Sequence, residues 1–153
     1  MRARPLADIP APPARPPAAS GIRVAAVGLE RWLDVFTALS GAAETTRAAH
    51  RRVLSAVPGI RRLLVLEADE RPVACGMSVL ERGLLGLFDL VTAADSRGRG
   101  FGGEILRRAL RWGLRAGARE AYLQVLDRNA VALRLYERAG FSTVYHYHYR
   151  EPP

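Results

Sequence analysis

Several residue types are wholly or nearly missing from this 153-residue sequence; among them, lysine is absent and cysteine occurs once. The single cysteine, Cys75, excludes an internal disulfide framework and a zinc site built from several cysteines. Three histidines, His50, His146 and His148, are too few and too badly spaced for a metal cage, so no metal is expected. All 23 basic residues are arginines, and with 15 acidic residues they give a net charge of +8. This surplus favours an anionic ligand or a polyanionic partner.

Long apolar runs are also missing. No stretch reaches the roughly 20 residues needed to cross a bilayer, and the N-terminal residues lack the continuous apolar core of a secretory signal. With 49% hydrophobic and 25% charged residues, 153 residues suit one globular domain rather than two. The sequence thus predicts a single-domain, cytoplasmic protein that does not enter a membrane.

Large apolar side chains are scarce in residues 1–20, which hold six of the ten prolines. Proline lacks a backbone N–H donor and pushes the residue before it toward extended geometry. We therefore predict a disordered tail or linker, rich in proline and alanine, over 1–20. A single folded domain is predicted over 21–153.

From residue 21 onward the hydrophobic pattern alternates between the periods of strands and of helices. Strands are predicted at 21–27, 62–68, 72–81, 84–92, 121–126 and 141–149, and helices at 30–39, 43–57, 101–116 and 129–139. Short turns join the three strands between 62 and 92 into a meander. The order β-α-α-β-β-β-α-β-α-β indicates an α/β protein with a mixed sheet.

Residues 97–103 read RGRGFGG and stand between an apolar strand and an amphipathic helix. The first amides of a helix lack acceptors within the helix, and the helix dipole adds positive potential, so a phosphate group can bind there. Gly100 and Gly102 allow the backbone to approach such a ligand, and Arg97 and Arg99 add charge. The alternative interpretation is a flexible turn with incidental arginines.

Asn129 and Tyr136 are seven residues apart on the last predicted helix, so they lie on one face with Ala132 between them. An amide, a small residue and a phenol suit an elongated ligand lying along the helix. Alternatively, Tyr136 packs in the core and Asn129 caps the start of the helix.

Together these motifs resemble those of the GNAT superfamily of acyl-CoA-dependent N-acyltransferases, most closely over residues 84–150. Three residues of the turn match the family's R/Q-x-x-G-x-G/A pyrophosphate motif: Arg97, Gly100 and Gly102. Six positions match the N-x-x-A-x-x-L-Y helix and the G-F that follows it: Asn129, Ala132, Leu135, Tyr136, Gly140 and Phe141. One difference is Ala94, where the family often has a proline that makes the loop rigid.

The resemblance implies bound acetyl-CoA, held between splayed strands of the mixed sheet. The pyrophosphate would rest on the glycine-rich turn, at Arg97, Gly98, Arg99, Gly100, Phe101 and Gly102. The pantetheine arm would pair with the strand ending Leu90-Val91-Thr92 and with Asn129. Tyr136 would be the general acid for the departing sulfur, in a direct attack of a neutral amine on the thioester.

The acceptor amine must first lose a proton, which requires a carboxylate directly or through water. Asp89 and Glu81 are the candidates. Asp89 is favoured because it interrupts an otherwise apolar strand, where a charge needs a reason or a partner. A paired structural aspartate is the alternative interpretation. Cys75 lies in a predicted central strand with no histidine near it in sequence, so we expect a buried core residue.

The favoured function is N-acetylation of the primary amine of a small molecule or an amino acid, with acetyl-CoA as cosubstrate. A protein or peptide N-terminus is the alternative acceptor within the same class. Two other classes stay open: a basic nucleic-acid-binding module and an acyl-CoA sensor without catalysis. The arginines are scattered and no aromatic stacking platform accompanies them, which disfavours the first. Retention of Tyr136 disfavours the second. A homodimer is compatible with the sequence.

Overall fold

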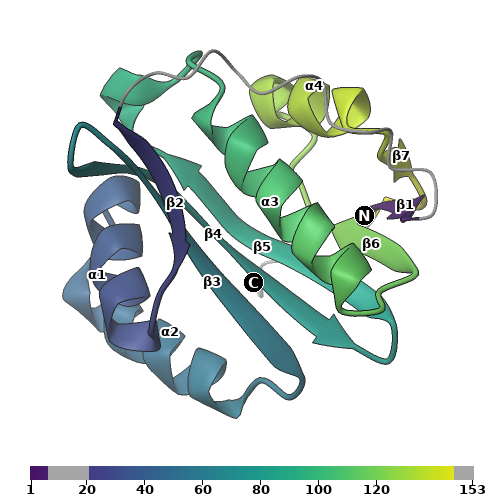
Figure 1. The fold of residues 1–153 in the computed structure, drawn as a ribbon, viewed down its shortest axis with the longest axis horizontal. Coiled ribbons are helices and arrows are strands. Elements are labelled where there is room, and N and C mark those ends of the chain that lie inside the picture. The colour runs from purple at the N-terminus through teal and green to yellow at the C-terminus, as the bar shows by residue number, and fades with distance from the viewer. Residues whose placement is uncertain (7–20, 147–153) are drawn as a thin grey trace, which may run out of the picture.

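The computed structural model describes residues 1–6 and 21–146. Its strands are β1 Arg2–Pro5, β2 Ile22–Ala26, β3 Ile60–Ala68, β4 Arg71–Glu81, β5 Leu84–Thr92, β6 Glu120–Leu123 and β7 Ser142–Thr143. Its helices are α1 Leu29–Ser40, α2 Glu44–Ala56, α3 Phe101–Arg115 and α4 Ala130–Arg138, and a short 3₁₀ turn covers Ala94–Ser96. The predicted α/β class with a mixed sheet is confirmed (Figure 1).

One sheet carries all the described strands, in the order β2-β3-β4-β5-β6-β1-β7. Only β5 and β6 are parallel; the other neighbouring pairs are antiparallel. The parallel pairing joins residues 84–87 to residues 120–123 and then stops, although β5 continues to Thr92. β6 therefore ends at Leu123, three residues before the predicted end at Leu126, because no neighbouring strand remains beside it. The sheet is split along the second half of β5.

Helices cover both faces of this sheet (Figure 1). α1 packs Trp32 and Phe36 against β3, β4 and β5, and α2 lies beside α1 on the same face. On the opposite face, α3 buries Leu106 and Leu110, spaced as an amphipathic helix requires. α4 adds Tyr136 to the core that α3 forms. The second half of β5 thus lies between two helical layers.

The first residues correct the prediction of a tail over 1–20. β1 lies between β6 and β7, with Arg2 opposite both Leu123 and Thr143. Leu6 is fully buried, and its backbone N–H donates to the carbonyl oxygen of Arg119 at 2.8 Å. A four-residue strand shows too little periodicity to be found from sequence, and its partners lie at the other end of the chain. Residues 7–20 lie outside the described residues.

Arg4 connects β1 to α4. Its side chain is buried and donates to the carbonyl oxygen of Ala139, just after the last turn of the helix. A cation is favoured there because the last carbonyls of a helix lack partners and the dipole is negative. Gly140 leaves room for the guanidinium, since a Cβ at that position would lie 3.2 Å from Nη1 of Arg4. The N-terminal strand therefore supports the helix that carries Tyr136.

The last predicted strand, 141–149, is shorter in the structure. β7 covers only Ser142–Thr143, residues 144–146 are irregular, and residues 147–153 lie outside the described part. None of the described helices is long and apolar enough to cross a membrane.

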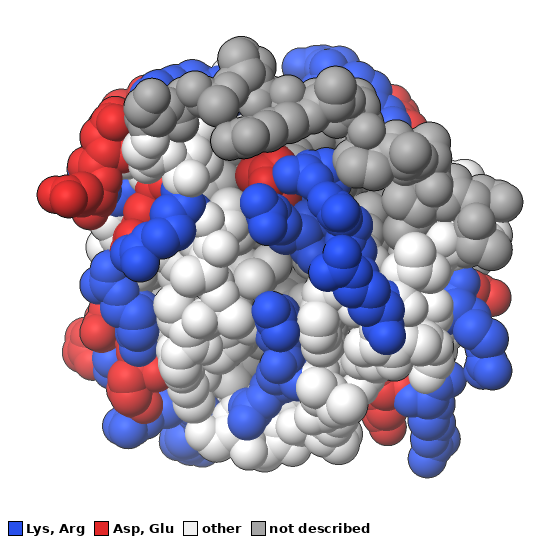
Figure 2. Space-filling model, viewed as in Figure 1, with Lys and Arg blue, Asp and Glu red and all other residues white. Residues whose placement is uncertain are grey.

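The solvated face of α3 is basic, and basic side chains lie along it in Figure 2. Two of these arginines, Arg107 and Arg108, pair with Glu104 one turn earlier. Partial burial acts to raise the pKa of Glu104, but the hydrogen bonds from the two guanidinium groups lower it below its ordinary value. Part of the positive charge on this face is thus neutralised within the helix itself.

Candidate active site

A β-bulge in β5 shapes the site. Cys75 of β4 lies opposite Val91, but Met77 lies opposite Phe88, so two residues of β5 face one residue of β4. The bulge carries Asp89, whose φ of +53° is left-handed, a conformation that aspartate adopts more readily than most residues.

The bulge changes which side chains share a face. Leu87 and Leu90 both pack toward α3, whereas Phe88 and Val91 both pack toward α1. A regular strand with alternating side chains would place Leu87 and Leu90 on opposite faces. Asp89 is the extra residue of the bulge, and it lies where the sheet splits.

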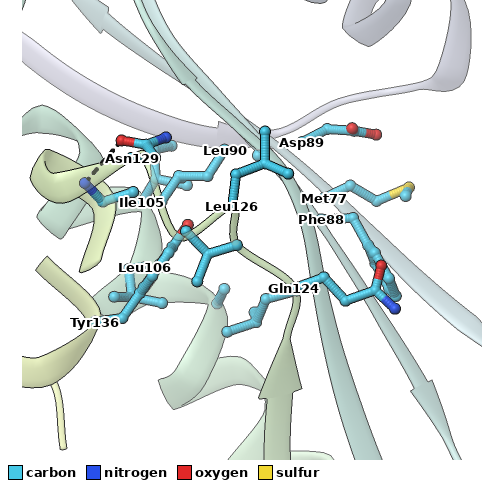
Figure 3. A pocket seen from close by; sticks show the side chains of 15 residues that line it. Met77, Phe88, Asp89, Leu90, Ile105, Leu106, Gln124, Leu126, Asn129 and Tyr136 are labelled. Atoms are coloured by element: carbon cyan, nitrogen blue, oxygen red, sulfur yellow. Dashed lines mark hydrogen bonds between the residues drawn. The ribbon is translucent and has the colours of Figure 1, made fainter. Parts of the chain in front are cut away.

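A cavity of about 350 Å³ opens where β5 and β6 separate (Figure 3). Its walls come from β4, β5, α3, the segment after β6, and α4. The side chains labelled in Figure 3 are Met77, Phe88, Asp89, Leu90, Ile105, Leu106, Gln124, Leu126, Asn129 and Tyr136. Most of this lining is apolar, and its polar groups are one carboxylate, two carboxamides and one phenol.

Tyr136 reaches the cavity from α4. Its side chain is 9% exposed and its ring packs at an angle against Phe141, with ring centroids 6.0 Å apart. Burial raises the pKa of the phenol above its ordinary value. The hydroxyl has no hydrogen-bond partner among the described residues, so it is a protonated donor available to a ligand.

Asn129 has two functions at once. It is the N-cap of α4, and its Oδ1 accepts a hydrogen bond from the backbone N–H of Ala132 at 3.1 Å. The capping interpretation is therefore correct. The same side chain lines the cavity, and its amide NH₂ group is not used by the cap. The cap fixes the direction in which that donor points.

The glycine-rich turn presents a row of unpaired amides. Gly98 and Gly100 have φ values of +76° and +85°, and α3 begins at Phe101 with no side-chain cap. The first backbone bond of the helix runs from the N–H of Glu104 to the oxygen of Gly100. No acceptor among the described residues faces the N–H groups of residues 98–103. Such a row is suited to bind phosphate oxygens.

The segment before the turn is held by polar contacts. Arg71 Nη1 donates to Asp95 Oδ2 at 2.9 Å, and the buried Ser96 hydroxyl donates to Asp95 Oδ1 at 2.9 Å. Hydrogen bonding to Arg71, then to Ser96, lowers the pKa of Asp95. These contacts fix the 3₁₀ turn that includes Ala94. They restrict this segment without the proline that the sequence comparison expects at Ala94.

The opposite side of the site is built from paired side chains. His50 Nε2 lies 2.9 Å from Asp89 Oδ2, and both side chains are mostly buried. Trp32 Nε1–H donates to the carbonyl oxygen of Gly76, the residue of β4 opposite the bulge, at 3.2 Å. α1 and α2 thus each supply one side chain to groups at the bulge.

A family model described as "Acetyltransferase (GNAT) family" matches residues 26–141. The chain belongs to this family. The curated "Uncharacterized N-acetyltransferase YobR" of Bacillus subtilis is 29% identical to this GNAT chain over 119 residues. The match covers 78% of this chain and 48% of YobR, so the chain spans about half the length of that relative.

Solved structures share the fold. One is "Aminoglycoside N-Acetyltransferase AAC(6')-Iy in Complex with CoA", at 16% identity with a TM-score of 0.69, covering 90% of this GNAT chain and 99% of that one. Another is the ribosomal-protein-S18-alanine N-acetyltransferase from Escherichia coli, at 18% identity with a TM-score of 0.67, covering 79% and 77%. At these identities the likeness establishes the GNAT fold.

The structure brings some predicted residues of this GNAT chain together and separates others. Asp89, Leu90, Asn129 and Tyr136 all line the cavity. The remaining predicted ligand-binding residues lie beyond its walls: Val91 packs toward α1, Thr92 lies next to Gly102, and Arg97, Gly98, Arg99, Gly100, Phe101 and Gly102 form the turn. Arg99 stacks over the ring of Phe101, with its Cζ 5.0 Å from the centroid.

Two other candidates lie away from the cavity. Glu81 ends β4 opposite Leu84, at the end of β5 where the sheet is still closed. It therefore cannot serve as the base in this cavity. Cys75 is fully buried, as expected, and burial, followed by the nearby charge of Asp89, raises the pKa of its thiol to about 12. A thiolate nucleophile is disfavoured there.

Several residues in and beside the cavity are not predicted from the sequence. Met77, Phe88, Gln124 and Leu126 line it, and His50 contacts Asp89 from α2. Strand periodicity could have predicted that Met77 and Phe88 lie on the same face of the sheet. No local signal in the sequence marks His50, because its partner lies 39 residues further along the chain.

Proposed function

We infer that this protein is an N-acetyltransferase that moves the acetyl group of acetyl-CoA to a primary amine. One observation carries the inference: a mostly apolar cavity opens at the split between β5 and β6, and a row of unpaired amides lies at the end of β5. The cavity suits a narrow arm and the amide row suits the diphosphate that precedes it. Family membership supports the same reading.

The residues present fit the cosubstrate. Residues 98–103 offer backbone N–H groups to the pyrophosphate, and Arg97 and Arg99 add positive charge. Gly102 has Thr92 Oγ1 3.3 Å from where its Cβ would be, so a larger residue would crowd this junction. Asn129 offers its amide NH₂, and Leu90 lines the cavity beside it. When bound, acetyl-CoA supplies the thioester carbonyl that the amine attacks.

Two side chains at the cavity move protons. Asp89 accepts a proton from the acceptor ammonium, which frees the nitrogen lone pair for attack. Tyr136 donates its phenolic proton to the departing sulfur, and its raised pKa keeps that proton in place at neutral pH. Figure 3 shows them reaching the cavity from different elements, β5 and α4, as an acid and a base on the two reacting groups require.

The acceptor that we propose is the primary amine of a small molecule or an amino acid. A peptide N-terminus is the alternative within the same class. Among the described lining residues, Asp89 is the one carboxylate, and Met77 and Phe88 beside it are apolar. An acceptor with one positive charge and an apolar body suits this surface better than a polycation.

Calorimetric titration with acetyl-CoA tests the proposal, with ADP and plain duplex DNA as controls. We expect saturable binding with a Kd of about 1–100 μM, much weaker binding of ADP because it lacks the pantetheine arm, and no binding of DNA. Absence of acetyl-CoA binding by protein with an intact circular dichroism spectrum would overturn the proposal. Strongly salt-dependent DNA binding would point to the nucleic-acid alternative.

A further inference from the structure

Asp89 occupies a backbone conformation that needs support from outside its own strand. Four non-glycine residues among those described have positive φ: Asp69, Glu70, Arg82 and Asp89. The first three lie in or beside the tight turns that join neighbouring strands, whereas Asp89 lies inside β5. Left-handed backbone persists at such a position only where surrounding contacts hold it, and it gathers at functional sites.

His50 supplies that contact from α2. A carboxylate only accepts hydrogen bonds, so the 2.9 Å contact is a donation from His50 Nε2–H to Asp89 Oδ2. The imidazole is itself packed edge-on against Phe36 and Trp32, with centroid distances of 4.8 and 6.1 Å. These rings fix the direction of the N–H, and therefore that of the carboxylate.

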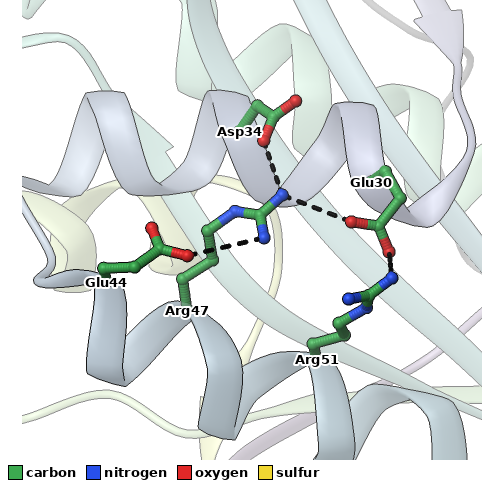
Figure 4. A network of polar contacts seen from close by, with 5 residues as sticks. All are labelled: Glu30, Asp34, Glu44, Arg47 and Arg51. Carbon is green, nitrogen blue, oxygen red and sulfur yellow. Dashed lines mark hydrogen bonds and ion pairs between the residues drawn. The ribbon is translucent and has the colours of Figure 1, made fainter.

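Two of the three arginines of α2, Arg47 and Arg51, pair with other acids (Figure 4). Arg47 pairs with Asp34 at 2.6 Å and with Glu30 at 3.3 Å, and Arg51 pairs with Glu30 at 2.8 Å. Hydrogen bonding to Asp34 is the largest cause of the raised pKa of Arg47. Arg47, one turn before His50, and Arg51, directly after it, are therefore both occupied by acids of α1 or of α2 itself.

Asp89 consequently faces an imidazole and no guanidinium. Its only ion-pair partner among the described residues is His50, and the nearby thiol of Cys75 is neutral. A guanidinium is permanently charged and would hold the carboxylate as a tight ion pair. An imidazole in its neutral form orients a carboxylate without cancelling its charge.

We propose that His50 is the positioning residue for Asp89: it holds Oδ2 so that Oδ1 is presented to the acceptor ammonium. This inference rests on the proposed acetyl transfer. In the step concerned, an N–H bond of the ammonium breaks, its proton bonds to Oδ1, and the electron pair stays on nitrogen for attack. His50 keeps its Nε2–H bond to Oδ2 throughout and exchanges no proton with the substrate.

Four variants test this role: His50→Leu, His50→Gln, Asp89→Asn and the double variant Asp89→Asn/His50→Leu. Leucine keeps apolar volume beside Phe36 but cannot donate, whereas glutamine carries an N–H donor near the place of imidazole Nε2. The readouts are kcat and KM with 2-phenylethylamine as the acceptor, followed by thiol release, and the Kd of acetyl-CoA. Thermal melting of each variant checks the fold.

We expect His50→Leu to lower kcat about tenfold, the scale of one hydrogen bond to a charged group, with the Kd of acetyl-CoA unchanged. His50→Gln recovers most of that loss. The double variant is no slower than Asp89→Asn alone, because His50 acts only through Asp89. A kcat within twofold of wild type for a folded His50→Leu, or losses that multiply in the double variant, would overturn the proposal.

A second measurement does not depend on turnover. A long-range ¹H–¹⁵N spectrum, with the His50 signals assigned from His50→Leu, should show a proton on Nε2 that is shifted downfield by its hydrogen bond, and Asp89→Leu should remove that shift. A ring protonated only on Nδ1 in the wild type overturns the pair. Failure of the wild type to bind acetyl-CoA would instead overturn the proposed function, and the His50 result would still stand.

Discussion

The glycine-rich turn after β5 and the β-bulge beside the cavity are built on opposite principles. The turn after β5 is exposed and offers backbone N–H groups that no side chain caps. The bulge is mostly buried and depends on side chains that α1 and α2 bring to it, such as His50 and Trp32. The first design needs a contiguous motif and the second needs tertiary packing. A ligand bound at the turn would therefore be recognised by a contiguous motif, and one bound beside the bulge through contacts distant in sequence.

The largest effect is expected where the backbone itself is the binding group. Gly100→Val places a Cβ and two methyl groups in front of the amide row and forces a β-branched residue to a φ of +85°. Affinity for acetyl-CoA should fall about 100-fold or more, the scale set by losing several charge-assisted hydrogen bonds. Calorimetry measures this directly.

Gly41→Val is the matched control. Gly41 also has a left-handed φ, +69°, and open space around its Cβ position, but it ends α1 away from the turn. Both variants should lose about 1–3 kcal/mol of stability from backbone strain. Only Gly100→Val should lose the ligand. Equal binding by the two folded variants would show that the turn is not the pyrophosphate site.

The next effect concerns Tyr136, which lines the cavity from α4. Tyr136→Phe should lower kcat about 100-fold, as loss of a general acid does, and leave the Kd of acetyl-CoA unchanged. Because burial raises the pKa of the phenol, its acid form persists as pH rises. At pH values up to about 9, loss of this proton should therefore not reduce the wild-type rate. Tyr122→Phe is the control, since Tyr122 packs against Phe88 outside the cavity lining. Normal turnover of Tyr136→Phe would remove the tyrosine from the mechanism.

Replacing Cys75 should have little effect on turnover. This result would support Asp89, rather than the thiol, as the residue at the bulge that takes part in the reaction. With the pKa of its thiol raised to about 12, the thiolate fraction is negligible at neutral pH. Cys75→Ala should keep kcat within about twofold while losing on the order of 1 kcal/mol of stability to the smaller side chain. Native protein should resist alkylation by iodoacetamide, as mass spectrometry can check. Rapid labelling or an inactive, folded Cys75→Ala would point to an acyl-enzyme route.

The smallest effect is expected for the ion pairs that join α1 and α2. Arg47→Met removes contacts to Asp34, Glu30 and Glu44, all of which are exposed. Such pairs contribute little in water, so Tm should fall by only about 1–3 °C, and less at high salt. Arg52→Met, at a position with no ion pair among the described residues, should leave Tm unchanged. A large loss of kcat in Arg47→Met would make this network part of the acceptor site.

How far the sequence predicts the structure depends on how local the cause is. The helix from Phe101 was predicted to its first residue, because its apolar stripe and glycine start are consecutive in the chain. The common face of Asn129 and Tyr136 follows from their spacing in the same way, and both line the cavity. The two interpretations of Asn129 are compatible, because it caps α4 and also lines the cavity. By contrast, the bulge at Asp89 depends on how β4 pairs with β5, and alternation alone cannot place it.

β1 has a consequence for how the molecule forms. Arg2 pairs with Leu123 and Thr143, which follow it by 121 and 141 positions. Contacts of such sequence separation carry a loop-closure entropy and slow the folding of the whole domain. During synthesis the first segment must wait without its partners until the last strand has left the ribosome. Because Arg4 contacts the end of α4, the strand that completes the sheet also adds a contact to the helix that carries Tyr136.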